Sequence, residues 1–235
     1  MEELIHFDKE LLLWFNGSNS LFLDSLIMTL TNAKTWIPLY LALFYVVVKS
    51  NTNVRDVLLV LAGAGLCVLL AGTIDDTIVK PLVARWRPGR DPEIGMLVDT
   101  VDGYRGGKYG FFSAHACNTF SLAIFLSLLI RQRLLTIALV SWSLINCYTR
   151  LYLGVHLPGD ITVGLIWGGI VGYSAYRIYC YALRRIALRR NPQAPASACR
   201  PASYSSRLCD IPIAVLVLTI IFALSKAYFQ AFLYI

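Results

Sequence analysis

Six segments of the chain are apolar on every side and approach or exceed the length that a helix needs to cross a bilayer. Such a crossing takes about 20 apolar residues, and a helix satisfies its own backbone hydrogen bonds in lipid. Only 15% of the residues are charged, whereas a soluble domain has about 25%. We therefore expect an all-α, polytopic membrane protein with six transmembrane helices. They are expected approximately at residues 34–49, 54–79, 113–131, 134–153, 160–182 and 211–235.

The N-terminal residues 1–33 differ from these segments because polar side chains interrupt the apolar ones. Glu10 and Asn16 flank the apolar run from Leu11 to Phe15, and Asp24 lies in the next apolar stretch. This mixture favours two amphipathic helices that lie in the membrane interface, with a turn at residues 16–19. A further crossing is the alternative. The expected organisation is interfacial helices at 1–33, a membrane core at 34–182, a basic loop at 183–210 and a last transmembrane helix at 211–235.

The basic residues indicate how the chain is oriented. Loops at 49–56, 131–133 and 184–207 hold most of the lysine and arginine outside the motifs described below, and the last has six arginines and no acidic residue. The positive-inside rule places these loops in the cytosol. A cluster of this kind is typical of a topology signal or an anionic-lipid contact, so we expect no nucleic-acid partner despite the net charge of +7. The six cysteines show no C-x2-C spacing, and we expect neither a disulfide framework nor a metal site.

Three short polar stretches fall in the loops on the opposite, outer side of the membrane. In order they read Lys80-x6-Arg87-Pro88, Ser113-Ala114-His115 and Arg150-x5-His156-x3-Asp160. Together they supply three cations, a hydroxyl, two imidazoles and a carboxylate. This set can bind a phosphate, attack it with one histidine and protonate the leaving group with the other. The sequence therefore predicts an enzyme that acts on a phosphate at the membrane surface.

The spacing within these stretches suggests how the side chains cooperate. Asp76 stands four residues before Lys80 and can pair with it on one helix face. Ser113 opens the third apolar segment, where a helix N-terminus favours an anion. Asp160 can accept the N–H of one ring nitrogen of His156, which leaves the other nitrogen free to attack. Arg85 and Arg90 are interpreted as membrane-end anchors. The polar loop at 89–110 is expected to cover or flank the site, and Gly164, Gly168 and Gly172 to form a smooth helix-packing face.

These stretches resemble the three motifs of the type 2 phosphatidic acid phosphatase family, K-x6-R-P, P-S-G-H and S-R-x5-H-x3-D. The resemblance covers about residues 75–182, with Phe112, Ala114 and Thr149 replacing the motif's proline, glycine and serine. It implies a metal-independent reaction without cofactor, through a phosphohistidine. By that resemblance His156 is the nucleophile, Asp160 orients it, and His115 protonates the leaving oxygen and later assists water. The implied phosphate-binding residues are Lys80, Arg87, Ser113 and Arg150.

The short chain and the outward site resemble the bacterial envelope branch of this family. That resemblance implies an inner-membrane enzyme whose active site faces the periplasm and whose partner is a lipid substrate. Our first expectation is removal of the 4′-phosphate of lipid A. Undecaprenyl diphosphate and phosphatidylglycerophosphate are alternative substrates, and a lipid could replace water as the phosphate acceptor. A haloperoxidase-like enzyme and a membrane scaffold with a decayed site are alternatives from other classes.

Overall fold

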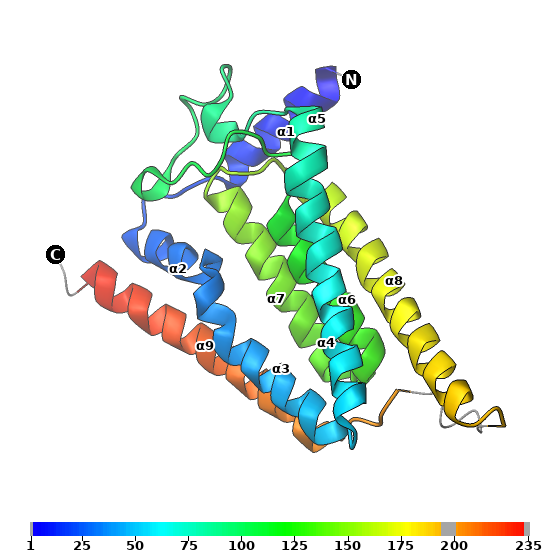
Figure 1. The fold of residues 1–235 in the computed structure, drawn as a ribbon. Helices are drawn as coiled ribbons and strands as arrows, with labels where there is room; N and C mark the ends of the chain where they lie inside the picture. The colour runs from blue at the N-terminus through cyan, green and yellow to red at the C-terminus, as the bar shows by residue number, and fades with distance from the viewer. Residues whose placement is uncertain (1, 194–200, 233–235) are drawn as a thin grey trace.

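The computed structural model describes residues 2–193 and 201–232, and within them it consists of helices joined by loops, without a β-strand (Figure 1). The predicted all-α fold is thus confirmed for this part of the chain. The α-helices are α1 (Glu2–Phe15), α2 (Leu21–Thr31), α3 (Ile37–Ser50), α4 (Val54–Val68), α5 (Lys80–Val83), α6 (Ala114–Ile130), α7 (Arg133–Tyr152), α8 (Pro158–Arg190) and α9 (Ser206–Phe232). Shorter helical turns are η1 (Ala33–Trp36), η2 (Leu69–Thr73), η3 (Asp75–Val79), η4 (Pro88–Arg90) and η5 (Val101–Gly103).

Three helices of the described residues are long and apolar enough to cross a membrane, and they mark the chain as a membrane protein. They are the continuous helix Val54–Val83, which joins α4, η2, η3 and α5, and the helices Arg133–Tyr152 and Ser206–Phe232. Helices α2 and α6 are apolar but shorter. Each of the six segments expected to cross the membrane coincides with a helix. Three of these helices meet the length and hydropathy that a membrane span requires.

The largest difference from the expected boundaries is at α8, which runs to Arg190 rather than ending near residue 182. Four arginines assigned to the basic loop therefore lie on a helix, and Arg207 lies on α9, which begins at Ser206. The chain becomes arginine-rich after Leu183, so its hydropathy falls there. The helix continues because leucine, alanine and arginine are good helix formers. Residues 194–200, including Arg200, and residues 233–235 lie outside the described part.

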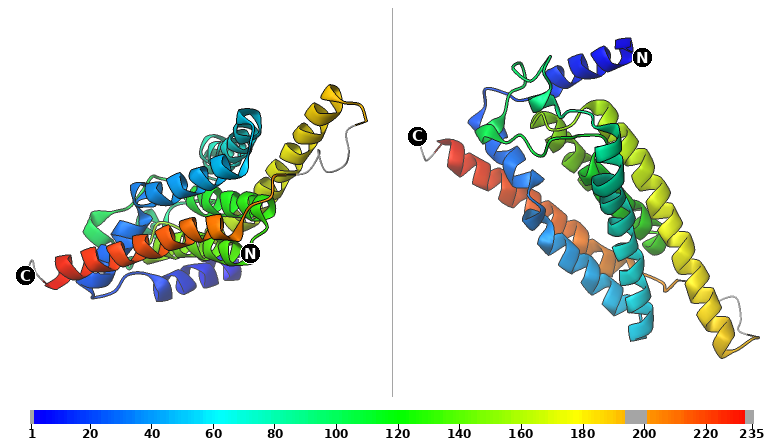
Figure 2. Two further views of the ribbon diagram at one scale, coloured as in Figure 1. Left: turned by 90° about the horizontal axis from the view of Figure 1, so that it is seen from below. Right: turned by 45° about the horizontal axis from the view of Figure 1, so that its top comes forward.

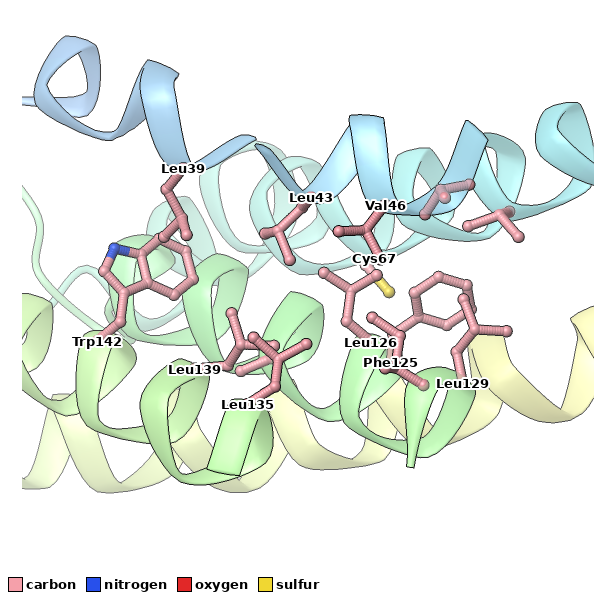
Figure 3. Close-up of a cluster of buried hydrophobic side chains, with 14 of the residues drawn as sticks. Leu39, Leu43, Val46, Cys67, Phe125, Leu126, Leu129, Leu135, Leu139 and Trp142 are labelled. Carbon is pink, nitrogen blue, oxygen red and sulfur yellow. The ribbon is translucent and has the colours of Figure 1, made fainter. Parts of the chain in front are cut away.

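The helices form two layers. Helices α4, α6, α7 and α8 make one bundle, and α3 and α9 run side by side against it (Figures 1 and 2). Side chains from α3, α4, α6 and α7 interlock in the largest buried cluster, which includes Leu43, Cys67, Phe125 and Leu139 (Figure 3). Between membrane spans, van der Waals packing of side chains stabilises such a cluster, because lipid is as apolar as the side chains themselves.

The glycines of α8 allow it to approach α6 closely. A Cβ on Gly164, Gly168 or Gly172 would lie 2.9 Å from the Ser113 O atom, 2.8 Å from Cys117 O or 2.4 Å from Ser121 O. The packing face expected from the repeat of glycines is confirmed. The close approach also brings the start of α6 to the start of α8, where the Ser113 N–H donates to the Asp160 carbonyl at 3.2 Å.

The N-terminal segment is fixed to the end of the bundle that carries the three motifs. Helices α1 and α2 are joined by a turn, as expected, and the Asn16 amide in that turn donates to Asp99 O at 3.0 Å and to Tyr152 O at 2.8 Å. Helix α2 packs along α9 and α7, while α1 lies across the loop region at the top of Figure 1. The segment therefore contacts the ends of several helices rather than standing apart.

Candidate active site

The three motifs meet at one end of the bundle, where α5 and α7 end and α6 and α8 begin (Figure 1). The side chains of Arg150, His156, Arg87 and Lys80 all lie within electrostatic reach of His115. Residues separated by up to 76 positions thus lie close together at this end of the bundle, in a region here called the motif pocket. Among residues 2–193 and 201–232, no group of three or more histidine, cysteine or acidic side chains is arranged to hold a metal ion.

Lys80 is held by two carboxylates at the end of the long helix. Its Nζ lies 2.5 Å from Asp76 Oδ1, the predicted pair, and also 2.7 Å from Asp75 Oδ2. Asp75 comes into range because η3 is a π-helical turn, in which residue i+5 lies over residue i. The other oxygen of Asp75 accepts the backbone N–H of Phe112 at 3.1 Å. Asp75 therefore connects Lys80 to the residue that precedes Ser113.

Arg87 and Arg150 bring two guanidinium groups to the pocket. Arg87 donates from Nε to Tyr109 O at 3.1 Å and from Nη1 to Val155 O at 3.3 Å. Burial, followed by the positive charge of Arg150, lowers the pKa of Arg87 from its usual value. Two cations placed this close favour an anion between them, and a planar guanidinium suits phosphate oxygens.

Arg150 lies in the last turn of α7 and is 2% exposed. Its Nη1 donates to Thr31 Oγ1 at 2.6 Å, and its Nη2 donates to the Tyr104 hydroxyl at 3.2 Å. The Tyr104 ring lies 5.6 Å from the guanidinium carbon. The Nε atom of Arg150 is buried and has no hydrogen-bond partner among the described residues. It therefore remains available to a ligand oxygen. Tyr104 belongs to the loop at 89–110, which reaches the site as expected.

Ser113 is the N-cap of α6, and its Oγ accepts the Ala116 N–H at 3.4 Å. It is fully buried. His115 follows in the first turn of α6, where the first backbone amides of a helix have no partner within the helix. This arrangement adds backbone donors to the cationic side chains.

His156 is 1% exposed, and its two ring nitrogens face different groups. Nε2 lies 3.4 Å from Arg87 Nη1, and Nδ1 lies 3.6 Å from Asp160 Oδ2. The second distance is longer than a hydrogen bond, so the expected N–H···carboxylate bond is not formed, and Nδ1 is buried without a hydrogen-bond partner among the described residues. Burial lowers the pKa of His156 to about 4, although the Asp160 carboxylate opposes this effect. At neutral pH the imidazole is uncharged, as a nucleophile must be.

Four residues near the site were missed or misread in the sequence: Asp8, Asp75, Arg85 and Tyr104. Arg85 was interpreted as an anchor, but its Nη1 donates to Asp160 Oδ1 at 2.9 Å. Residues 85–87 pair with residues 108–110 in an extended conformation. Alternate residues of an extended segment point to the same side, which could have placed Arg85 beside Arg87.

An apolar cavity of about 380 Å³ lies below the pocket, between α3, α4, α6 and α7. Asn118 and Thr119, about one turn after His115 on α6, line it together with Tyr40 and Trp142. The cavity thus begins close to the charged site and continues along the apolar faces of the bundle.

Comparison with known proteins gives the same family as the motifs. The PAP2 superfamily profile matches residues 53–184. The chain is 42% identical over 180 residues to a lipid A 4′-phosphatase of Bacteroides thetaiotaomicron, which covers 76% of this chain and 79% of that protein. It is 36% identical over 186 residues to a lipid A 4′-phosphatase of Porphyromonas gingivalis, covering 79% and 78%.

A more distant relative is the decaprenylphosphoryl-5-phosphoribose phosphatase of Mycobacterium tuberculosis. It is 34% identical over 111 residues, which cover 47% of this chain and 55% of that protein. No solved structure is significantly similar to the chain.

Proposed function

The chain belongs to the PAP2 superfamily, and from that premise we propose that it is a membrane phosphatase that removes the 4′-phosphate of lipid A. The proposed reaction is supported by the burial of His156 between Arg87 and Asp160. The proposed substrate is supported by the similarity, over more than three quarters of the chain, to two proteins named lipid A 4′-phosphatase.

In the first step His156 attacks the phosphorus atom with Nε2, the nitrogen that faces Arg87. An N–P bond forms, the bond from phosphorus to the sugar oxygen breaks, and His115, in the imidazolium form that the negative charge of the bound phosphate favours, donates a proton to that oxygen. Asp160 holds the Nδ1 side of His156, so that the tautomer with Nε2 free is favoured. Lys80, Arg87, Ser113 and Arg150 bind the phosphoryl oxygens, whose charge is redistributed in the transition state.

In the second step water attacks the phosphohistidine. His115, now neutral, accepts a proton from this water, the N–P bond breaks, and inorganic phosphate leaves. His156 returns to its starting state. The cycle uses protein side chains and water, and it needs no cofactor.

The apolar cavity below the pocket supports a substrate with hydrocarbon chains. Its lining residues Tyr40, Leu122 and Trp142 lie on α3, α6 and α7, and it starts about one turn after His115. A lipid whose phosphate lies at the membrane surface would place its chains in this direction. The two lipid A 4′-phosphatase relatives favour lipid A over undecaprenyl diphosphate and phosphatidylglycerophosphate.

The proposed topology is six spans in a bacterial inner membrane, with the active site facing the periplasm. Residues 1–33 form interfacial amphipathic helices beside the site, residues 34–182 form the catalytic core, and α9 adds a span beyond it. The arginine-rich end of α8 lies in the cytosol, which agrees with the positive-inside rule.

The test is phosphate release from purified lipid A in detergent micelles, with mass spectrometry of the product. The wild-type protein should remove one phosphate, and fragmentation should place the loss at the 4′ position. His156→Ala should abolish the reaction while the protein still folds and inserts. Arg90→Gln is the matched control, because Arg90 contacts the Gly106 carbonyl on the loop rather than the pocket.

Undecaprenyl diphosphate is assayed in parallel. Hydrolysis of that lipid with lipid A left intact would overturn the proposed substrate. Transfer of the phosphate to a second lipid rather than to water would overturn the proposed reaction type. Ordinary activity in His156→Ala would overturn the mechanism.

A further inference from the structure

Asp160 is fully buried beside the pocket, and the arginine that forms an ion pair with it is Arg85. Asp160 is 0% exposed, and its Oδ1 accepts from Arg85 Nη1 at 2.9 Å. A buried carboxylate is strongly destabilising unless a partner compensates its charge. His156 is neutral near pH 7 and cannot supply that charge. Arg85 is thus the cation that forms a direct ion pair with the buried Asp160 carboxylate next to His156.

The contacts of Asp160 also fix its direction. Oδ1 is held by Arg85, whereas Oδ2 accepts the Leu157 N–H at 3.0 Å and lies 3.6 Å from His156 Nδ1. With both oxygens held on defined sides, the carboxylate cannot rotate away from the imidazole. The planar fork of an arginine is suited to this role because it constrains two directions at once.

The second arm of the same guanidinium is held by the N-terminal helix. Arg85 Nη2 donates to Asp8 Oδ2 of α1 at 2.7 Å, and Asp8 Oδ1 accepts the Gly159 N–H at 2.7 Å. Gly159 lies at the start of α8, next to Asp160. Asp8 therefore contacts both the arginine that holds Asp160 and the backbone that carries it.

Helix α1 is itself anchored to the outer loop beside this contact. Lys9, the neighbour of Asp8, lies 2.9 Å from Asp91 Oδ2 and 2.7 Å from Glu93 Oε2. These residues raise the pKa of Lys9 against the opposing effect of its burial. Helix α1 lies outside the region matched by the PAP2 profile, residues 53–184.

From these contacts we infer that Arg85 is a positioning residue that holds Asp160 toward His156, and that Asp8 on α1 holds Arg85 in turn. The inference rests on the proposed phosphatase reaction and extends it to two residues outside the three motifs. It makes the N-terminal helix part of the support of the active site rather than only a membrane attachment.

The test compares four variants with the wild type: Arg85→Gln, Arg85→Lys, Asp8→Asn and the double variant with Arg85→Gln and Asp8→Asn. Activity is measured with lipid A and with phenyl phosphate, a soluble phosphomonoester, and thermal unfolding is followed in the same detergent. Arg90→Gln is the control, an arginine of the same segment that hydrogen-bonds a loop carbonyl.

Arg85→Gln should lower kcat about 10- to 100-fold, the loss typical of a residue that orients a functional group, with KM nearly unchanged. Arg85→Lys should recover part of the loss, because it keeps the charge but not the fork. Asp8→Asn should give a smaller loss. The double variant should be no worse than Arg85→Gln, because coupled residues are not additive.

A wild-type kcat for Arg85→Gln on either substrate would overturn the inference. A raised KM at constant kcat would also do so, since it would place Arg85 on the substrate. Additive losses in the double variant would mean that Asp8 and Arg85 act independently, and this would overturn the inference that Asp8 holds Arg85. If the wild type hydrolysed phenyl phosphate but not lipid A, the proposed substrate would fail while the variant series still tested Arg85.

Discussion

At the scale of single residues, His156 combines deep burial with a neighbouring cation and a neighbouring anion. Arg87 faces Nε2 and Asp160 faces Nδ1. The cation disfavours protonation of the ring, and the anion favours it. Burial decides the outcome and lowers the pKa of His156 to about 4. The sequence motif predicted Asp160 beside this histidine, but neither its contact with Arg87 nor the degree of its burial.

His156 should therefore stay neutral well below the pH at which an ordinary histidine becomes charged, about 6.5. Between about 6.5 and about 4, the unfolded chain binds a proton that the folded protein does not. The contribution of His156 to the free energy of unfolding is thus fully present above pH 6.5 and is lost as the pH falls toward 4.

The measurement is an NMR titration of protein labelled at histidine, which is tractable because the chain has three histidines. The resonance of His156 is assigned by its loss in His156→Gln. A midpoint near pH 4 is expected. A midpoint at or above about 6.5, the value of a solvated histidine, would contradict the buried environment described here.

Residue-level prediction from the sequence succeeded where contacts follow regular helix spacing and failed where they do not. Asp76 was paired with Lys80 by the i,i+4 rule, and the structure has this contact. Asp75 was missed because the π-helical turn shifts the register by one residue. Arg85 was misread because its partners, Asp8 and Asp160, are 77 and 75 residues away, and no local pattern reports such a contact.

At the scale of elements, the contact between α6 and α8 positions the site. It joins Ser113 at the start of one helix to Asp160 at the start of the other. The three glycines of α8 make this contact possible, because backbone atoms of α6 occupy the space that their side chains would need.

Gly168→Ala and Gly172→Ala should each destabilise the protein. The new Cβ would lie 2.8 Å from Cys117 O or 2.4 Å from Ser121 O, and backbone atoms cannot move without separating the helices. Overpacking of this kind costs about 1–3 kcal/mol, measured as a lower unfolding temperature in detergent. Gly169→Ala is the matched control, since its Cβ would meet Phe120 Cε1 at an ordinary 3.5 Å. Equal effects of all three substitutions would refute this packing explanation.

The end of a helix could be predicted from the sequence where the apolar segment and the helix end at the same residue. They do so at α7, where the expected segment 134–153 matches Arg133–Tyr152. They do not at α8, where the arginine-rich last seven residues follow the buried Leu183 and remain helical. Hydropathy indicates which residues lie in the bilayer. The helix itself continues beyond them as long as the residues favour helix formation.

At the scale of the whole molecule, the two ends of the bundle differ in charge and chemistry. One end carries the motif pocket and the loop at 89–110, and the other carries the arginine-rich end of α8 (Figure 1). The sequence predicted this separation from loop charges alone. It could not predict how α1 contacts the pocket, because the ion pairs of Asp8 and Lys9 join it to residues far along the chain.

The proposed orientation predicts different reagent access at the two ends. Met96 is 97% exposed on the loop at 89–110, and Arg190 is exposed at the end of α8. In a background without other cysteines, Met96→Cys should react with a membrane-impermeant maleimide on intact spheroplasts, and Arg190→Cys should react only after lysis. The reverse pattern would invert the topology, and reaction of both in intact spheroplasts would exclude the odd number of spans proposed between them, which are α6, α7 and α8.

The central claim is that His156 carries the phosphoryl group during turnover, and rapid quenching in alkali tests it most directly because phosphohistidine survives at high pH. Enzyme mixed with excess lipid A should show a phosphate on the peptide containing His156 within the first turnover, and fragmentation should locate it on the imidazole. Lipid A that loses its phosphate while this peptide stays unmodified at every time point would contradict the account.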